Sequence, residues 1–247
     1  MRKLLVVFSI LLTFFATISA SFAGDFATVR SIGFSTDGKY YAFEQYGVQD
    51  GSGFPYSEIF IIDTERDSWV KGTPLRFKLK DENASLYSDV RKPNLQKAAP
   101  LLQKLGIQKP GDLLVYNPTT EISANSHKAA FSLSSLNPVS SLTYNIEIAL
   151  IPVPMPECVR SAAEPMGFSL SLKPFSGGPK RVIHQDSAFK RLPKSRGCAV
   201  DYRLTHVFFY SAKNRDVLIN LVQVFSTGFE GDDGRFIAIP VVGRDGF

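Results

Sequence analysis

The three histidines of the chain, His127, His184 and His206, are the first candidates for acid–base or metal chemistry. A metal site collects several His, Cys or carboxylate ligands at short spacing, but only His184 has such a neighbour, Asp186. The chain contains no G-x-S-x-G, H-E-x-x-H or phosphate-cradling glycine motif. Motifs therefore predict no catalytic residue, metal site or cofactor. Because catalytic groups can assemble from distant parts of a chain, a hydrolase with His184 or His206 as base is an alternative.

Two glycine-rich segments combine acids with aromatic side chains. They provide two candidate binding loops, the first with Asp50, Phe54, Tyr56 and Glu58, the second with Phe229, Glu230, Asp232 and Asp233. Rigid aromatic side chains on loops make efficient contacts with partners. The acids also suit calcium, although neither segment follows the 12-residue EF-hand pattern. Glycine and aspartate serve ordinary turns as well, so turn formation is the alternative.

The N-terminus has the parts of an export signal, namely a basic start (Arg2 and Lys3), an apolar run (4–18) and small side chains before a cleavage site near Ala23. The apolar run of about 15 residues is shorter than the roughly 20 that a spanning helix needs. No later run is long and apolar enough to span a membrane. We therefore expect a cleaved leader over 1–23, and a single β-rich domain over 24–247 in the periplasm or outside the cell. An uncleaved anchor is the alternative.

The chain has two cysteines, Cys158 and Cys198. In an oxidising compartment pairing is the default, and two cysteines allow only one internal bridge. The bridge would close a loop of about 40 residues, which the chain-entropy model values at about 4 kcal/mol. We expect this disulfide rather than a free thiol or a metal pair.

The charge balance says little about partners, since loss of Arg2 and Lys3 with the leader lowers the formal net charge from +5 to +3. Six basic residues nevertheless cluster within 179–196: Lys180, Arg181, Lys190, Arg191, Lys194 and Arg196. Such a cluster can bind nucleic acid through counterion release. In an exported protein we interpret it instead as a solvated loop or as a patch facing anionic envelope components, and we predict no nucleic-acid partner.

Most of the mature chain has the alternating or β-branched composition of strands. The predicted strands are 28–34, 39–46, 58–64, 69–79, 113–117, 128–135, 143–153, 167–174, 180–184, 200–211, 216–226 and 235–242. An Asp-Gly pair within 35–38 signals a hairpin. The first four strands are therefore expected to form an antiparallel meander.

One helical insertion is expected near 94–106, where small and leucine side chains recur on one face and Gly106 can stop the helix. Pro100 lies inside this stretch, so the helix is either kinked or divided. The leucine face is expected to pack against the sheet.

The fold class predicted is all-β, made mainly of antiparallel meanders. A turn-and-strand pattern at 34–43 returns weakly at 123–133 and 231–240. Such echoes are typical of propeller blades, but hairpins recur in any antiparallel fold. A closed propeller has four or more blades, and four are not found. The arrangement is therefore propeller-like or a sandwich.

Two blocks of the sequence carry a resemblance. The first, 33–70, contains the FSTDGKYYAF turn and strand, the QYGVQDGSGFPY loop and the EIFIID strand, and the second is GFEGDDGRFIAI at 228–239. In these blocks the chain resembles an uncharacterised bacterial family of predicted secreted proteins. The resemblance implies export and a β-rich fold, and it implies no reaction. The first block also resembles the TolB-type propeller repeat over a short stretch, with Thr36 in place of the usual proline.

These observations favour an exported, non-enzymatic binding or interaction module of the cell envelope. Its partner would be a protein or another envelope component. A hydrolase acting on an envelope substrate and a calcium-stabilised structural protein are the alternatives.

Overall fold

The computed structural model describes residues 24–134, 142–158, 163–228, 231–243 and 247. Its strands are β1 Thr28–Ser35, β2 Tyr40–Val48, β3 Pro55–Asp63, β4 Ser68–Trp69, β5 Leu75–Lys78, β6 Ile107–Lys109, β7 Asp112–Tyr116, β8 Lys128–Ser132, β9 Thr143–Pro152, β10 Met166–Pro174, β11 Arg181–Gln185, β12 Ala199–Ala212, β13 Arg215–Thr227 and β14 Asp232–Gly243. The helix α2 spans Lys92–Lys104, and shorter helical turns are η1 Leu86–Arg91, η2 Pro156–Cys158 and η3 Lys194–Arg196.

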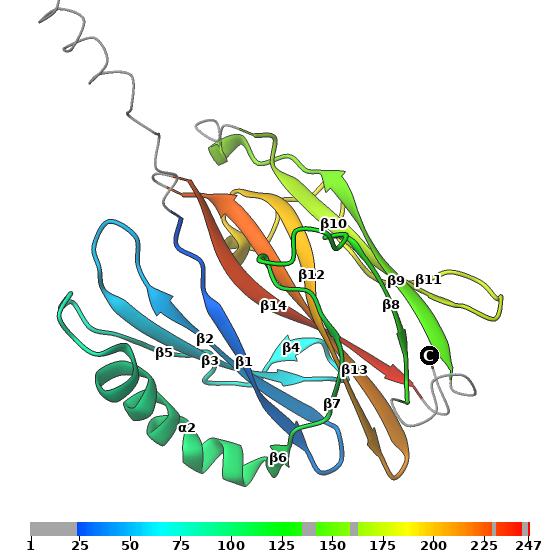
Figure 1. Ribbon diagram of the computed structural model, residues 1–247, viewed down its shortest axis with the longest axis horizontal. Coiled ribbons are helices and arrows are strands. Elements are labelled where there is room, and N and C mark those ends of the chain that lie inside the picture. The colour runs from blue at the N-terminus through cyan, green and yellow to red at the C-terminus, as the bar shows by residue number, and fades with distance from the viewer. Residues whose placement is uncertain (1–23, 135–141, 159–162, 229–230, 244–246) are drawn as a thin grey trace, which may run out of the picture.

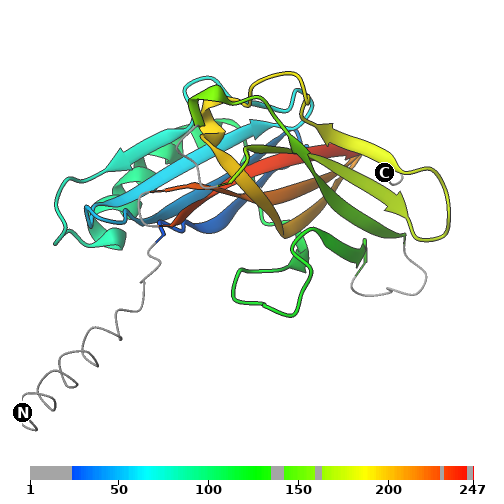
Figure 2. The same ribbon diagram turned by 90° about the horizontal axis from the view of Figure 1, so that it is seen from above.

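Three antiparallel sheets stack in layers, and α2 covers the outside of the first (Figure 1). The N-terminal sheet has the order β4-β3-β2-β1-β6, with β5 also paired to β3. The central sheet is β14-β13-β12-β7, and the outer sheet is β11-β10-β9-β8. The view from above shows the long strands of the central sheet running between the other two layers (Figure 2).

The central sheet is covered on both faces, and β13 shows this in its sequence. Val217 and Ile219 pack into the core shared with the N-terminal sheet. Leu218 and Val222 pack into the core shared with the outer sheet. Successive side chains of a strand point to opposite faces. A strand buried on both faces must therefore carry apolar side chains at its odd and its even positions alike.

The core between the N-terminal and central sheets is rich in aromatic rings. Phe43 and Phe60 stack with ring centroids 4.9 Å apart, and Phe34 and Tyr41 meet at 4.7 Å. Aromatic pairs at such separations add stability beyond their buried area. The aromatic strands at the start of the chain therefore form an interface between sheets.

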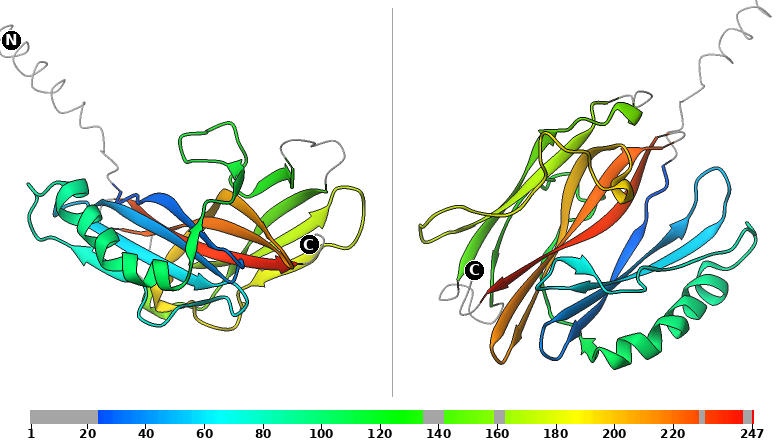
Figure 3. Two further views of the ribbon diagram at one scale, coloured as in Figure 1. Left: turned by 90° about the horizontal axis from the view of Figure 1, so that it is seen from below. Right: turned by 180° about the vertical axis from the view of Figure 1, so that it is seen from behind.

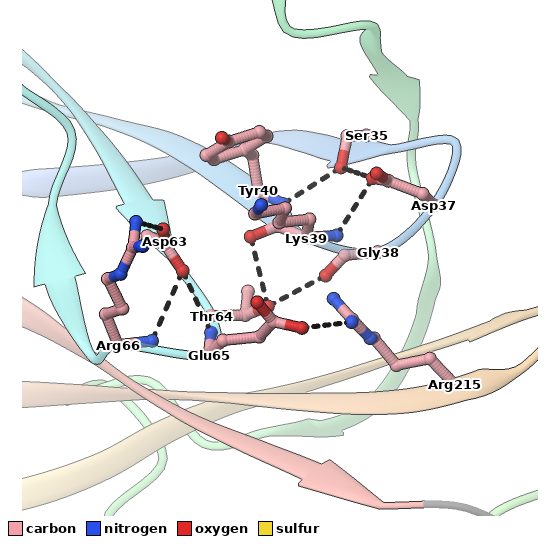
Figure 4. Close-up of polar contacts among 10 residues, drawn as sticks. All are labelled: Ser35, Asp37, Gly38, Lys39, Tyr40, Asp63, Thr64, Glu65, Arg66 and Arg215. Carbon is pink, nitrogen blue, oxygen red and sulfur yellow. Dashed lines mark hydrogen bonds and ion pairs between the residues drawn. The ribbon is translucent and has the colours of Figure 1, made fainter.

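The predicted hairpin turn at 35–38 joins β1 to β2 (Figure 4). The hydroxyl of Ser35 donates to the carboxylate of Asp37 over 2.6 Å, and the same carboxylate accepts from the amide of Lys39 over 3.0 Å. Gly38 has a φ of +72°, which glycine adopts without steric cost. The turn is thus encoded locally, by residues 35–39.

One contact attaches this hairpin to the turn after β3, and a second attaches that turn to β13 (Figure 4). The hydroxyl of Thr64, at the end of β3, donates to the carbonyl of Gly38 over 2.9 Å. The neighbouring Glu65 pairs with Arg215, the first residue of β13. The turn after β3 therefore connects the N-terminal sheet to the central sheet.

The helical insertion is confirmed, with its start at Lys92 rather than near residue 94, and it follows the π-helical turn η1. Pro93 suits the first turn, where its missing N–H is not needed. Pro100 lies inside one continuous helix. Gly106, with a φ of +65°, follows its end. Leu101 and Leu102 of α2 pack against Ala42 and Ile61 of the N-terminal sheet, as expected. The helix lies along the outside of this sheet (Figure 3).

The all-β class with one helical insertion is confirmed, and the sheets stack face to face; the described residues form no closed propeller. The expected strand 69–79 divides into β4 and β5, because Gly72, with a φ of +87°, and Pro74 interrupt it. The turn between β13 and β14 is also shorter than expected, because β14 begins at Asp232 instead of residue 235.

The predicted disulfide is confirmed. Cys158 of η2 is bonded to Cys198, and the sulfur atoms are 2.10 Å apart. Cys198 directly precedes β12 and follows η3. The bridge therefore ties the loop that carries η3 to the end of the outer sheet.

Candidate functional site

A cleft of about 330 Å³ opens between the N-terminal sheet and the edge of β14. We call it the basic cleft, and its characteristic lining residues are Glu58, Phe60, Trp69, Arg76, Lys194, Arg196 and Arg235. A second hollow of about 300 Å³ shares Glu58, Arg76 and Arg235 with it and adds Gln49, Tyr56 and Lys78. The two hollows therefore adjoin one another at these three shared residues.

One wall of the basic cleft is aromatic. Trp69, on the short edge strand β4, is 45% exposed. Its ring meets Phe60 edge-on, with ring centroids 5.6 Å apart. Phe60 is itself stacked on Phe43, so the indole rests on a packed support.

The opposite wall is η3, which carries Lys194 and Arg196. Arg196 is buried and pairs with Asp186, whose carboxylate also accepts from the amide of Phe168 over 2.9 Å. Although burial opposes ionisation, hydrogen bonds from His184 and the Phe168 amide, together with Arg196, hold the pKa of Asp186 below its ordinary value. The disulfide at Cys198 fixes the same wall from its other end.

A chain of hydrogen bonds forms the floor. The amide of Phe236 on β14 donates to the side chain of Gln45 over 2.8 Å, and Gln45 donates to Glu58 over 2.6 Å. Arg76 donates to the other oxygen of Glu58 over 2.6 Å. Gln45 thus satisfies an edge amide of the central sheet, which protects that edge from pairing with another chain.

The charge of the cleft is positive. Glu58 is the only carboxylate among the described residues that line it, and both of its oxygens already accept hydrogen bonds. Lys194 is exposed and forms no ion pair with any described residue. In the adjoining hollow Lys78 is bonded to the neutral side chain of Gln49 over 3.1 Å. The arrangement suits an anionic ligand, because two ammonium groups lack a carboxylate partner.

Asp25 connects the two predicted loops. Its carboxylate accepts from the hydroxyl of Tyr56 over 3.0 Å and pairs with Arg235, whose guanidinium lies 4.9 Å from the Tyr56 ring. Its amide donates to Asp233 over 3.1 Å. Burial above all, with Asp25 nearby, raises the pKa of Tyr56. Nothing in the local sequence around Asp25 signals this role.

Asp50 and Phe54 of the first predicted loop occupy the β2–β3 turn, whereas Tyr56 and Glu58 lie on β3. Asp50 is exposed and accepts from the amide of Gly51, which has a φ of +74°. Phe54 is half-buried, whereas Tyr56 is only 5% exposed and belongs to the core between the sheets. Glu58 lines the cleft, and Asp50 and Phe54 lie outside its lining.

The second predicted loop is only partly described. Phe229 and Glu230 lie outside the described residues. Asp232 and Asp233 are the first residues of β14, where Asp233 bonds to the N-terminal segment. Tyr56 of the first loop and Asp233 of the second are therefore connected, because each forms a hydrogen bond with Asp25.

The histidines lie in three separate places. The Nε2 atom of His184 lies 3.3 Å from Arg196 Nη2, and the ring stacks on Phe168. His127 contacts Asp201 at 2.9 Å. His206 packs against Tyr116 and Phe208.

Within the described ranges, no histidine is hydrogen-bonded to a serine, threonine or cysteine side chain. Among the same residues, no three His, Cys, Asp or Glu side chains gather where they could hold a metal ion. In the part of the chain that the structure describes, no helix has the length and apolar character to span a membrane.

The stacked antiparallel sheets, the outer helix and the disulfide define an all-β protein of the kind found in oxidising compartments. The family model described as "Predicted secreted protein (DUF2259)" matches residues 42–242, and the chain belongs to this family. No curated protein and no solved structure matches the chain. The family description and the disulfide agree with an extracytoplasmic location. The resemblance to a family of predicted secreted proteins is thereby confirmed.

Proposed function

We propose that this protein is an exported, non-enzymatic binding module whose basic cleft holds an anionic component of the cell envelope. One observation carries the proposal. The cleft combines an exposed indole, Trp69, with the basic side chains of Arg76 and Lys194. Glu58 is the only carboxylate among its described lining residues, and it already accepts hydrogen bonds from Gln45 and Arg76.

Each part of the cleft has a matching ligand group. Carboxylates and phosphates form short, charge-assisted bonds with guanidinium and ammonium groups. Arg76 and Lys194 are both exposed and can reach such a ligand. The face of Trp69 can lie against a sugar ring or another flat apolar surface. An anionic polysaccharide would supply both kinds of group.

Export is part of the proposal. The leader over 1–23, with cleavage near Ala23, would deliver the chain to the periplasm or the exterior. There the Cys158–Cys198 bridge can form and hold the η3 wall of the cleft.

The test is titration calorimetry with polygalacturonate, a carboxylated polysaccharide. We expect the double variant Arg76→Gln with Lys194→Gln to bind about tenfold more weakly or worse, because charged hydrogen bonds contribute about 1.5–3 kcal/mol each. The matched control is Lys190→Gln with Arg181→Gln, which removes the same charge from exposed positions outside the cleft.

Affinity should also fall with added salt, as expected for charged contacts. Equal binding by both double variants would overturn the proposal. So would a lack of binding by the unmodified chain to polygalacturonate, to polyphosphate and to vesicles of anionic phospholipid. No geometric observation favours the hydrolase alternative to a comparable degree, since no described hydrogen bond of His184 or His206 involves a hydroxyl or thiol.

A further inference from the structure

The first residues after the expected leader are attached to the start of β14. The amide of Gly234 donates to the carbonyl of Asp25 over 2.9 Å, and the amide of Ala27 donates back to Gly234 over 2.9 Å. The Asp25 amide donates to the Asp233 carboxylate over 3.1 Å. Residues 25–27 thus add a short parallel bridge to the edge of the central sheet.

Gly24 lies against this edge with no room for a side chain. A Cβ atom on it would be 2.3 Å from the carbonyl oxygen of Asp232 and 2.6 Å from the ring of Phe26. The chain therefore reaches β14 through a residue that must be glycine, directly after the predicted cleavage position at Ala23.

Cleavage at Ala23 would make the nitrogen of Gly24 an α-ammonium group. An α-amino group is mainly protonated below about pH 7.7. Because one residue separates this nitrogen from the Asp25 amide, covalent geometry keeps it within about 7 Å of the Asp233 carboxylate. Asp233 accepts from a neutral amide and forms no ion pair within the described part of the chain.

We infer that removal of the leader after Ala23 creates an ion pair between the α-ammonium of Gly24 and the carboxylate of Asp233, which fastens the new N-terminus to β14. The charge needed for this pair exists only in the processed chain. In the unprocessed chain the same nitrogen is a neutral amide.

The consequence for the basic cleft rests on the proposed function. Asp25 follows Gly24 directly, and its carboxylate holds both the Tyr56 hydroxyl and Arg235. Both side chains line the cleft or its adjoining hollow. Fastening Gly24 therefore fixes Asp25, and through it one side of the binding surface. Processing of the leader would complete the site.

The test compares two versions of the chain that differ only in the residue at which they begin. One begins at Gly24, and the other begins at Ser21. The longer chain keeps Gly24 but carries its ammonium up to about 10 Å away. We expect the chain starting at Gly24 to have the higher melting temperature, by about 2–4 °C. Asp233→Asn should remove this difference, whereas the control Asp50→Asn, at an exposed turn acid, should leave it intact.

Equal melting temperatures for the two chains would overturn the ion pair. A difference that persists in the Asp233→Asn variants would overturn it as well. In the same samples, polygalacturonate should bind several-fold more tightly to the chain starting at Gly24. If the melting temperatures differ but the affinities do not, the ion pair is supported and its effect on the basic cleft is overturned. If neither chain binds, the proposed function fails, and the melting temperatures alone decide the ion pair.

Discussion

The guanidinium of Arg91 forms two hydrogen bonds with the carboxylate of Glu44, 3.1 Å from Nε to Oε1 and 2.8 Å from Nη2 to Oε2. Glu44 lies on β2 and is fully buried, and Ser57 also donates to it over 2.9 Å. Arg91 ends the π-helical turn η1 and lies 3.4 Å from the centre of the Tyr46 ring. This pair fixes the start of the helix on the N-terminal sheet.

Replacing Arg91 by leucine should lower the free energy of unfolding by about 3–5 kcal/mol, because an unpaired carboxylate would remain buried. Urea unfolding measures this change. Lys180→Ala is the matched control, since its pair with Glu147 is exposed on both sides and such pairs contribute at most about 1 kcal/mol. If Arg91→Leu lowers the free energy of unfolding no more than the control does, the Glu44 carboxylate does not remain buried without a partner.

The disulfide should matter for both stability and binding. Replacing Cys158 and Cys198 by serine is expected to lower the free energy of unfolding by about 2–5 kcal/mol. Because Cys198 adjoins η3, polygalacturonate binding should also weaken under conditions where the variant is still folded. Circular dichroism and calorimetry on the same samples separate the two effects. Unchanged affinity in the folded variant would mean that η3 keeps its position without the bridge.

Local patterns predicted much of the fold. The hairpin at 35–38 depends on hydrogen bonds among residues 35–39, and the helix depends on a face of small and leucine side chains. The disulfide follows from compartment and number of cysteines. The prediction of one strand over 69–79 was wrong, because the backbone turns at Gly72, with a φ of +87°, and Pro74 lacks the N–H that a strand ladder needs.

The candidate site was less predictable, because it joins residues far apart in the chain. Arg76, Lys194 and Arg235 meet only after the N-terminal sheet is stacked on the central sheet. Glu58 was identified from its loop, and Lys194 only as part of the basic cluster at 179–196. No sequence pattern pointed to Arg76 or Arg235. Tyr56 shows the limit most clearly, since its sequence position is next to a turn and its ring is in the core.

Stability should fall as the pH falls from about 6.5 to about 4. Burial lowers the pKa of His206 to about 4, whereas an unfolded histidine titrates near 6.5. Between these values the unfolded chain binds more protons than the folded chain, so lowering the pH favours unfolding, by up to about 3 kcal/mol from this group. Urea unfolding at several pH values measures the slope.

His206→Phe is the variant that isolates this effect, because a phenyl ring can keep the stacking on Phe208 without titrating. Its stability should depend less on pH over the same interval. His127→Phe, at a histidine that contacts Asp201 instead, should keep the His206 contribution. If the pH dependence of His206→Phe equals that of the unmodified chain, the loss of stability in acid arises elsewhere.

Trp69 should report ligand binding directly, because it is the only tryptophan of the chain and lines the basic cleft. It is 45% exposed, so its fluorescence in the free protein should be quenched readily by acrylamide. Polygalacturonate seated against the indole would exclude water and quencher, giving a blue-shifted emission and a smaller quenching constant. The Arg76→Gln with Lys194→Gln variant should require about tenfold more ligand for the same change. Binding that leaves the emission and the quenching constant unchanged would place the ligand away from this wall and assign Trp69 a purely structural role against Phe60.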